Sequence, residues 1–331
     1  MNMKKPIIVA LAMVFMFAAA MSASAATIKA LEIKGEIPSD PTDPFWSQYG
    51  PTKGKEVMID MDPQMITNPM WPNPNTKWVN VKAVRNDKEI AVRLEWMDGT
   101  RNDIMVQAQS YKDQAAIMFP VKQEGEEPPF TMGGEGERVN IWQWKAEWDK
   151  ENAGKGGNTT MQDMEDNYKN MAMGSGSYYM YEPDGKLAMS EFKSGEPGTK
   201  EELRANRGAT DLSKRSTFVD FGMGKNEGVY NPGRATGNIL SDASKRRSPI
   251  EDLNAEGFST LTTQAHQDVD GHGNWNNNRW AVVFKRSFTT TDENDTQFKG
   301  KKTPMAIAIW DGNNKERNGQ KAVTQWNNLE Y

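Results

Sequence analysis

The chain has 331 residues and a formal net charge of −5. A weakly acidic chain without a basic stripe is a poor partner for nucleic acid, because phosphate binding needs clustered lysine and arginine. The chain contains no cysteine and only two histidines, His266 and His272, which excludes a thiolate zinc site, a cysteine-bound iron–sulfur cluster, a covalently attached c-type haem and any site built from several histidines.

The first 25 residues have the three parts of a signal peptide. A short basic start, MNMKK, precedes the apolar segment PIIVALAMVFMFAAA, and Ala23-Ser24-Ala25 supplies the small residues of a cleavage site. We predict cleavage after Ala25 and export to the periplasm. The alternative is a retained membrane anchor, but the apolar segment is shorter than the ~20 residues that a span requires. No later segment is apolar enough to span, so we predict no membrane span.

Strand patterns dominate the chain outside its middle part. Residues 79–96 alternate apolar and polar side chains around a turn at 85–88, which predicts a hairpin with one buried face. Further strands are predicted at 114–120, 138–148, 279–288 and 304–310. The last two are apolar on both faces, as in central strands. Short strands between turn-rich loops predict an all-β protein, a jelly-roll-like β-sandwich that forms one domain over residues 26–331.

The middle of the chain, about residues 150–256, is polar and rich in Gly, Asn, Lys and Ser. It lacks an apolar periodicity of its own, so we interpret it as a loop-rich, partly helical insertion in the sandwich. Helices are predicted near 160–172 and 199–206. Close to its end, residues 268–273 (DVDGHG) resemble half of a calcium loop. The twelfth position of that loop needs a bidentate carboxylate but is Arg279, so we interpret the segment as a Gly-rich turn.

Aromatic residues cluster in the segment 142–148, which contains Trp142, Trp144 and Trp148. Trp142 and Trp144 share one face of the predicted strand. They can form part of the core, or they can form a flat apolar wall that suits a sugar ring or a porphyrin.

Two further residues are candidate ligands. Met132 lies in the turn-like segment PPFTMGGEGE beside Phe130, and a methionine thioether is a soft ligand that suits haem iron. Lys321 ends the polar loop after Trp310. It can be an ordinary surface lysine, or a buried lysine whose neutral amine binds a metal. The motifs alone do not decide between these alternatives.

Seven segments, in this order, resemble the haem b-binding γ subunit of type II DMSO-reductase-family molybdoenzymes, a group that includes ethylbenzene dehydrogenase, dimethylsulfide dehydrogenase, selenate reductase and chlorate reductase. They are LEWMDGTRND (94–103), DQAAIMFP (113–120), PPFTMGGEGERVNIWQWKAEW (128–148), GRATGNIL (233–240), SPIEDLNAEGFSTLTTQ (248–264), GHGNWNNNRWAVVFKRSF (271–288) and AIAIWDGNNKERNGQKAVTQW (306–326).

The resemblance implies a β-sandwich that holds one non-covalent b-type haem between two axial ligands, Met132 and Lys321. Lys315 is a competing amine in the same loop. From their proximity in the sequence, we expect Phe130 and Trp142 to form an aromatic wall that keeps the site dry. The implied function is non-catalytic electron transfer between the iron–sulfur subunit of a molybdenum oxidoreductase, which also has a molybdopterin catalytic subunit, and a periplasmic cytochrome c or similar carrier.

Two alternatives from other functional classes remain at this stage. A Trp-rich exported β-sandwich can be a carbohydrate-binding module, in which case Met132 and Lys321 have no special role. The chain can also be an enzyme such as a glycosidase with paired carboxylates, although no pair stands out among its many Asp and Glu residues.

Overall fold

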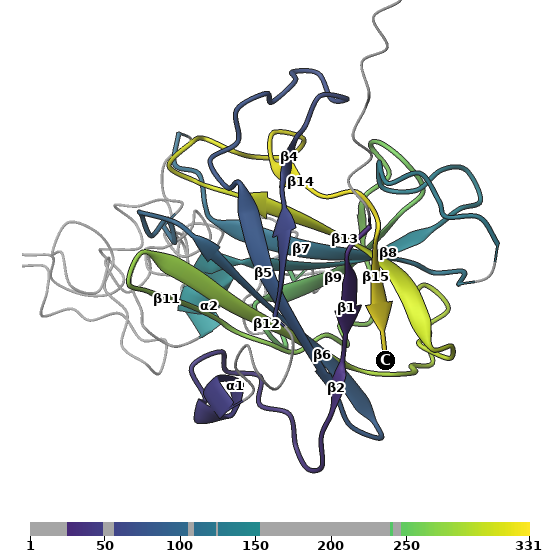
Figure 1. Cartoon of the computed structure of the whole chain (residues 1–331). Coiled ribbons are helices and arrows are strands. Elements are labelled where there is room, and N and C mark those ends of the chain that lie inside the picture. Colours follow the sequence, from purple (N-terminus) through teal and green to yellow (C-terminus); the bar gives the residue numbers. More distant parts are fainter. Residues whose placement is uncertain (1–24, 49–55, 105–108, 124, 153–238, 241–245) are drawn as a thin grey trace, which may run out of the picture.

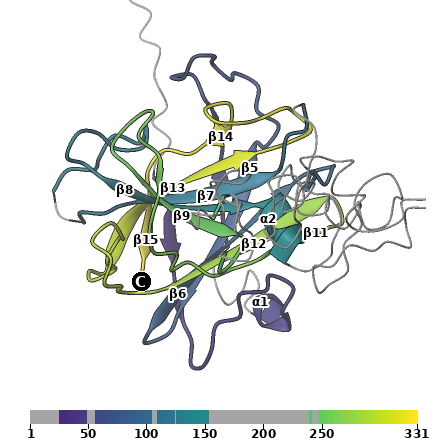
Figure 2. The ribbon, with the colours of Figure 1, turned by 180° about the vertical axis from the view of Figure 1, so that it is seen from behind.

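The computed structural model describes residues 25–48, 56–104, 109–123, 125–152, 239–240 and 246–331 (Figure 1). Within these ranges the strands form two sheets that lie face to face (Figures 1 and 2), as the sequence predicts for an all-β sandwich. Residues 1–24 of the predicted signal peptide (1–25) and the predicted helices near 160–172 and 199–206 lie outside the described residues. None of the helices in the described ranges is long and apolar enough to cross a membrane.

The larger sheet has nine strands in the described residues. Its main path runs through β1 (Thr27–Lys29), β15 (Asn327–Glu330), β13 (Lys302–Trp310), β7 (Gln114–Pro120), β8 (Val139–Lys145), β9 (Ile250–Ala255) and β10 (Thr262–Thr263). Beside this path, β14 (Ala322–Val323) pairs with β13 and with β4 (Asp62–Pro63). All these pairings are antiparallel except β1 with β15.

The smaller sheet has six strands in the same part of the chain. Its path is β11 (Gly273–Asn276), β12 (Arg279–Ser287), β6 (Glu89–Met97), β5 (Trp78–Arg85) and β2 (Leu31–Glu32), and β3 (Val57–Asp60) pairs with β5. The predicted hairpin is confirmed, with Asn80 opposite Glu95 and Arg85 opposite Ile90. Its turn is held by the Asn86 side chain, whose Oδ1 accepts hydrogen bonds from the amides of Lys88 (2.8 Å) and Glu89 (2.7 Å).

The core lies between the sheets and is built by alternation along each strand. On β7, Ala115, Ile117 and Phe119 point into this core, whereas Ala116 and Met118 point to the other face of the larger sheet. All seven residues of β7 are buried, because loops cover that second face as well. The nine-stranded sheet therefore has apolar side chains on both faces.

The short helices are α1 (Pro44–Gln48) and α2 (Ala146–Asn152). The predicted strand 138–148 ends at Lys145, because Asp149 of α2 folds back and accepts a hydrogen bond of 2.7 Å from Trp144 Nε1. Asp149 also accepts a bond from the Gly273 amide, so α2 lies against β11 (Figures 1 and 2). The predicted insertion boundary at 256 is wrong, since Ile250–Ala255 form a buried strand of the larger sheet.

Candidate functional site

The outer face of the nine-stranded sheet, which points away from the smaller sheet, carries a second apolar cluster. We call it the outer-face cluster. Its buried residues come from β7, β8, β9 and β13, and Met132, Ala308 and Trp326 pack against it. The buried members are Ala116, Met118, Val139, Ile141, Leu253, Ala255, Ala306 and Trp310.

Met132 is held above this cluster by a tight turn that leads into β8. Its φ is 71°, in the left-handed region, which costs a residue with a Cβ on the order of 1 kcal/mol. Two backbone hydrogen bonds fix the turn, from the Gly133 amide to Pro129 O (2.9 Å) and from the Gly257 amide to Met132 O (2.7 Å). Gly133 has φ 79°, and a Cβ there would clash with the carbonyl oxygen of Glu137. The turn therefore fixes where the Met132 side chain begins.

Lys321 reaches the same cluster from the opposite end of the chain. It follows the two-residue turn Asn318–Gly319, closed by mutual backbone hydrogen bonds between Arg317 and Gln320, and it immediately precedes β14. The Lys321 Nζ lies 4.7 Å from the centroid of the Trp310 ring. The ring is fixed in turn, because Trp310 Nε1 donates a 3.0 Å hydrogen bond to Asn318 O.

The electrostatic environment of Lys321 is unusual for a lysine. Burial lowers the pKa of its amine to about 8, and no acidic side chain raises it again. The residue as a whole keeps some exposed surface. The pKa depends on the apolar surroundings of the amine itself more than on the exposure of the rest of the side chain. Among the described residues, Lys321 has no salt-bridge partner. A ligand amine must be neutral, and at pH 7 a pKa near 8 leaves about a tenth of it neutral.

The competing lysine has a different environment. Lys315 is exposed, at the tip of the loop, where its amide donates a 3.0 Å hydrogen bond to Gly312 O. Of these two lysines, only Lys321 combines burial of the amine with contact to the outer-face cluster. The two lysines therefore differ in burial: the Lys321 amine is buried, and Lys315 is exposed.

The loops that carry Met132 and Lys321 are linked directly. Trp326, which follows β14, donates a 2.8 Å hydrogen bond from Nε1 to Pro128 O at the start of the Met132 turn. Its ring packs against the outer-face cluster together with Met132. Two segments that lie far apart in the sequence are thereby joined over one face of the sheet.

Phe130 and Trp142 do not share one location. Phe130 is partly buried in the same turn as Met132. Trp142 is fully buried between the two sheets, where Phe119 contacts its ring at 4.8 Å between centroids and the Arg286 guanidinium lies 5.0 Å from it. Its neighbour Ile141 is the residue that points to the outer face. The structure therefore places Trp142 behind the sheet, away from Met132.

The tryptophans of the 142–148 segment offer no open platform. Trp142 and Trp144 are fully buried in the core, and Trp148 is covered by the cations of Lys145 and Arg246, at 4.0 and 4.1 Å from its ring centroid. A sugar ring stacks on an exposed aromatic face. These residues therefore act in packing, and the observation counts against a carbohydrate site on them.

Comparison with known proteins identifies the family. The family model described as "Ethylbenzene dehydrogenase" matches residues 43–322. The chain belongs to the ethylbenzene dehydrogenase family. Both predicted ligands lie within the matched range, and the family resemblance found in the sequence is confirmed.

Named relatives of this member of the ethylbenzene dehydrogenase family come from three organisms. ORF7 of Haloferax mediterranei, named as a respiratory nitrate reductase heme subunit, is 21% identical over 87% of this chain and 67% of its own. The chlorate reductase subunit gamma of Ideonella dechloratans is 23% identical over 77% of this chain and 66% of its own. The dimethylsulfide dehydrogenase subunit gamma of Rhodovulum sulfidophilum is 27% identical over 34% and 42%. The chain thus spans at most about two thirds of each relative.

Among solved structures, a family 9 carbohydrate-binding module from Caldicellulosiruptor kristjanssonii in complex with cellotriose covers 92% of both chains at 6% identity. Its TM-score of 0.33 is too low to support an argument about ligands.

Sequence reasoning on this family member missed two residues of the site. Trp310 and Trp326 are the aromatic side chains that contact Lys321 and join the two loops. Their positions at the ends of the loop 311–325 were a visible signal, because an otherwise polar loop with aromatic ends has to bury those ends somewhere.

Proposed function

We propose that this chain is a periplasmic electron-transfer subunit that binds one non-covalent b-type haem, with Met132 and Lys321 as the axial ligands of the iron. It would relay electrons between the iron–sulfur subunit of a molybdenum oxidoreductase and a soluble carrier such as a periplasmic cytochrome c. The molybdopterin subunit of that complex would perform the substrate chemistry, so this chain itself would not be catalytic.

The observation that carries the proposal is the buried amine of Lys321, which has no acidic partner among the described residues. A charged group placed in apolar surroundings without a partner destabilises a fold unless it serves another purpose. Binding to iron supplies such a purpose, because a metal competes with the proton for the neutral amine. The contact with Trp310 and the short turn Asn318–Gly319 hold the amine at the outer-face cluster before any ligand arrives.

Met132 supports the same conclusion from the other loop. A left-handed conformation at a non-glycine residue is retained when its surroundings force it, and such residues gather at binding sites. Here two features hold Met132 in this conformation: the hydrogen bond from the Gly257 amide to the Met132 carbonyl, and the close approach of the next residue, Gly133, to the Glu137 carbonyl. A thioether is a soft ligand that raises the reduction potential of haem iron.

Exposed apolar side chains flank both loops. Ile66 is 53% exposed and precedes Thr67, whose Oγ1 donates a 3.4 Å hydrogen bond to Gly319 O. Phe258 is 49% exposed and follows Gly257, which binds the Met132 carbonyl. Exposed apolar side chains beside a candidate site can become covered when a ligand binds. They fit an apolar macrocycle held over this face.

When bound, haem supplies reversible one-electron chemistry. The residues of this chain would have distinct tasks: Met132 and Lys321 would hold the iron, and Trp310 and Trp326 would hold the loops that carry them. Iron held by two side chains of the protein would leave no position for substrate or oxygen. This arrangement suits electron relay instead of catalysis.

The test is a pyridine haemochrome assay with oxidised and reduced spectra on the chain exported to a bacterial periplasm. We expect a b-type signal near one haem per chain. Lys321→Met and Met132→Leu should each change the spectrum of the bound haem and its potential, whereas the matched control Lys315→Met should leave both unchanged. A folded, colourless chain that takes up no added haem would refute the proposal, and an unaltered spectrum in Lys321→Met would refute the ligand assignment.

A further inference from the structure

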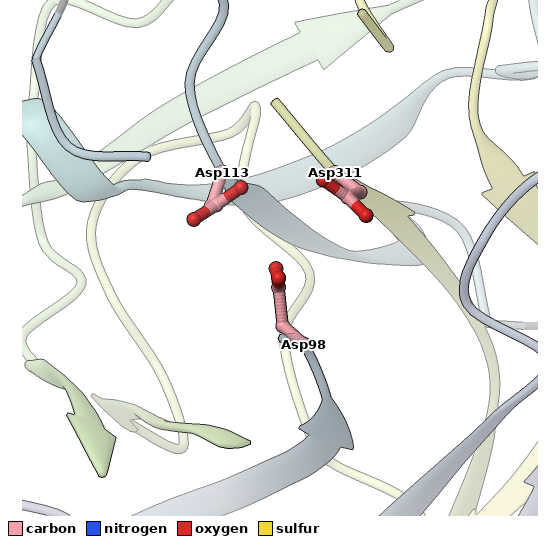
Figure 3. A group of neighbouring side chains, drawn as sticks. All are labelled: Asp98, Asp113 and Asp311. Carbon is pink, nitrogen blue, oxygen red and sulfur yellow. The ribbon is translucent and has the colours of Figure 1, made fainter. Parts of the chain in front are cut away.

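Three buried aspartates meet at one end of the sandwich. Asp98 follows β6 of the smaller sheet, Asp113 precedes β7, and Asp311 follows β13 of the larger sheet. One carboxylate oxygen from each lies within 4.8 Å of the other two. Figure 3 shows the Asp98 carboxylate pointing toward the other two across the gap between the sheets.

The three aspartates are buried away from solvent. Asp113 is fully buried, and Asp98 and Asp311 are 4% and 5% exposed. In the described part of the chain, none of them has a lysine, arginine or histidine within salt-bridge distance, although other buried acids do. Asp103 nearby, for example, pairs with Arg101 at 2.7 Å and with Lys150 at 3.4 Å. A buried charge without a partner costs several kcal/mol, so the cluster needs compensation.

The hydrogen bonds within the described residues leave some lone pairs of the three carboxylates without a donor. Asp98 Oδ1 accepts bonds from the amide and hydroxyl of Thr100, but its Oδ2 is buried and accepts none from the residues that the structure describes. Asp113 Oδ1 accepts one bond, from the Gly312 amide at 2.9 Å, and Asp311 Oδ2 accepts one, from Asn75 Nδ2 at 2.7 Å. A carboxylate oxygen has two lone pairs. Each residue therefore retains at least one acceptor for a further bond.

Backbone amides and side-chain N–H groups orient these carboxylates from outside. Asp113 Oδ2 is held by the Asn102 amide (2.7 Å) and by Trp280 Nε1 (2.9 Å). Gly312 approaches closely enough to donate to Asp113 because it has no side chain, since a Cβ there would clash with the carbonyl oxygen of Tyr111. The Asp98 carboxylate, whose Oδ2 has no hydrogen-bond partner among the described residues, points toward the other two carboxylates (Figure 3).

We propose that Asp98, Asp113 and Asp311 bind one divalent cation, best matched by calcium, that fastens the two sheets together at this end of the sandwich. Oxygen-only ligand sets rich in carboxylates select hard cations over zinc, copper or iron. Each carboxylate can bind calcium through one or both oxygens, so three of them supply about three to six of the six to eight ligands that calcium takes.

The cation would also anchor the loop that presents Lys321. Asp311 is the first residue of that loop, and its amide donates a 2.9 Å hydrogen bond to the buried carboxylate of Glu316 farther along it. This consequence rests on the proposed haem function. The cation site itself does not, because its ligands and their geometry are independent of Met132 and Lys321.

The alternative without a cation is a network of shared protons. Burial and the neighbouring Asp98 raise the pKa of Asp113 to about 8, and burial with Asp311 raises that of Asp98 to about 6. In that case an Asp→Asn change removes repulsion and is neutral or stabilising. With a bound cation it removes a ligand and weakens binding. The two alternatives therefore predict opposite effects on stability in calcium.

The experiment uses the full chain, freed of metal with a chelator, and Ca²⁺ or Tb³⁺ as the probe. We expect Tb³⁺ luminescence excited through tryptophan, because Trp280 donates directly to Asp113, and displacement of Tb³⁺ by Ca²⁺ in preference to Mg²⁺. The melting temperature should rise with added Ca²⁺. Asp98→Asn should weaken Ca²⁺ binding at least about tenfold and lower the melting temperature in calcium.

Two control variants separate this site from other effects. Asp103→Asn changes a buried acid that already has cationic partners, and Lys321→Met changes the proposed haem ligand. Both should keep the calcium response of the unmodified chain. The proposal is overturned if Ca²⁺ leaves the melting temperature unchanged, or if Asp98→Asn binds Tb³⁺ as strongly as the unmodified chain.

Discussion

The amine of Lys321 lies 4.7 Å from the centroid of the Trp310 ring, while the indole nitrogen of Trp310 is bonded to the carbonyl of Asn318 three residues before the lysine. The end of the loop is therefore bonded back to Trp310 at its start, and this contact holds the Lys321 amine beside the Trp310 ring. A cation next to an aromatic face gains some attraction. Burial of the amine lowers its pKa to about 8.

This environment predicts that Lys321 lowers the stability of the haem-free chain. The folded state binds the lysine proton more weakly than the unfolded state does. Below pH 8 the penalty is therefore fully present, and it disappears as the pH rises from about 8 toward 10.5. Lys321→Met should raise the free energy of unfolding of the haem-free chain at pH 7, by at most about 3 kcal/mol. Urea unfolding at pH 7 and pH 10 measures both effects, and a less stable variant would contradict this account.

Two glycines of the same hairpin test how the Met132 turn is held. Gly133 and Gly136 both have positive φ, at 79° and 74°, but a Cβ is blocked by the Glu137 carbonyl only at Gly133. Gly136→Ala should cost about 1 to 2 kcal/mol, from the backbone strain alone. Gly133→Ala should cost about 1 to 3 kcal/mol more and should release bound haem, because the turn has to shift. Denaturant unfolding and haem retention on a desalting column measure the two losses. Equal losses in both variants would mean that the turn is not tightly held.

Two tryptophans on opposite faces of the larger sheet should behave differently. Trp142→Phe removes the 3.1 Å hydrogen bond from Nε1 to Asn140 in the core and should lower the free energy of unfolding by about 1 to 2 kcal/mol, with no change in the haem spectrum. Trp326→Phe removes the bond to Pro128 that joins the two ligand loops, and should weaken haem retention more than it lowers stability. Parallel haem titrations and unfolding curves compare them. If Trp142→Phe shifted the spectrum, our placement of Trp142 behind the site would be incorrect.

His272 gives the fold a pH dependence away from the haem site. Its hydrogen bond to Asp149, followed by the charges of Asp149, Asp270 and Asp40, raises the pKa of the imidazole above 6.5. The stabilisation is fully present below pH 6.5 and is lost as the pH rises through the higher, folded-state pKa. The side chain is 43% exposed, so the effect should be small.

The measurement for His272 is the melting temperature across pH 5.5–8.5, compared with His272→Gln. The difference between the two chains should shrink as the pH rises. A His272→Gln profile parallel to that of the unmodified chain would rule out the linkage.

The sequence alone determined the long strands and the chemistry that the chain cannot perform. Alternation at 79–96 and the apolar runs at 114–120 and 304–310 require burial on one or both faces, so these segments form strands in any compact fold. The absence of cysteine, together with the presence of only two histidines, limited the side chains that can bind a metal. Family resemblance then singled out Met132 and Lys321, which no local pattern could have paired.

The tertiary structure decided which residues meet. Alternation showed that Trp142 and Trp144 share a face, but not which face of the sheet becomes the core. The second sheet packs over the face that carries both tryptophans, so Trp142 lies in the core and not beside Met132. Asp98, Asp113 and Asp311 each stand beside a strand end without any spacing motif, because their contact depends on how two sheets align. Likewise, whether Lys321 is an ordinary surface lysine depends on Trp310 and on the loop that buries its amine, and burial is a property of the folded chain, not of the sequence around the residue.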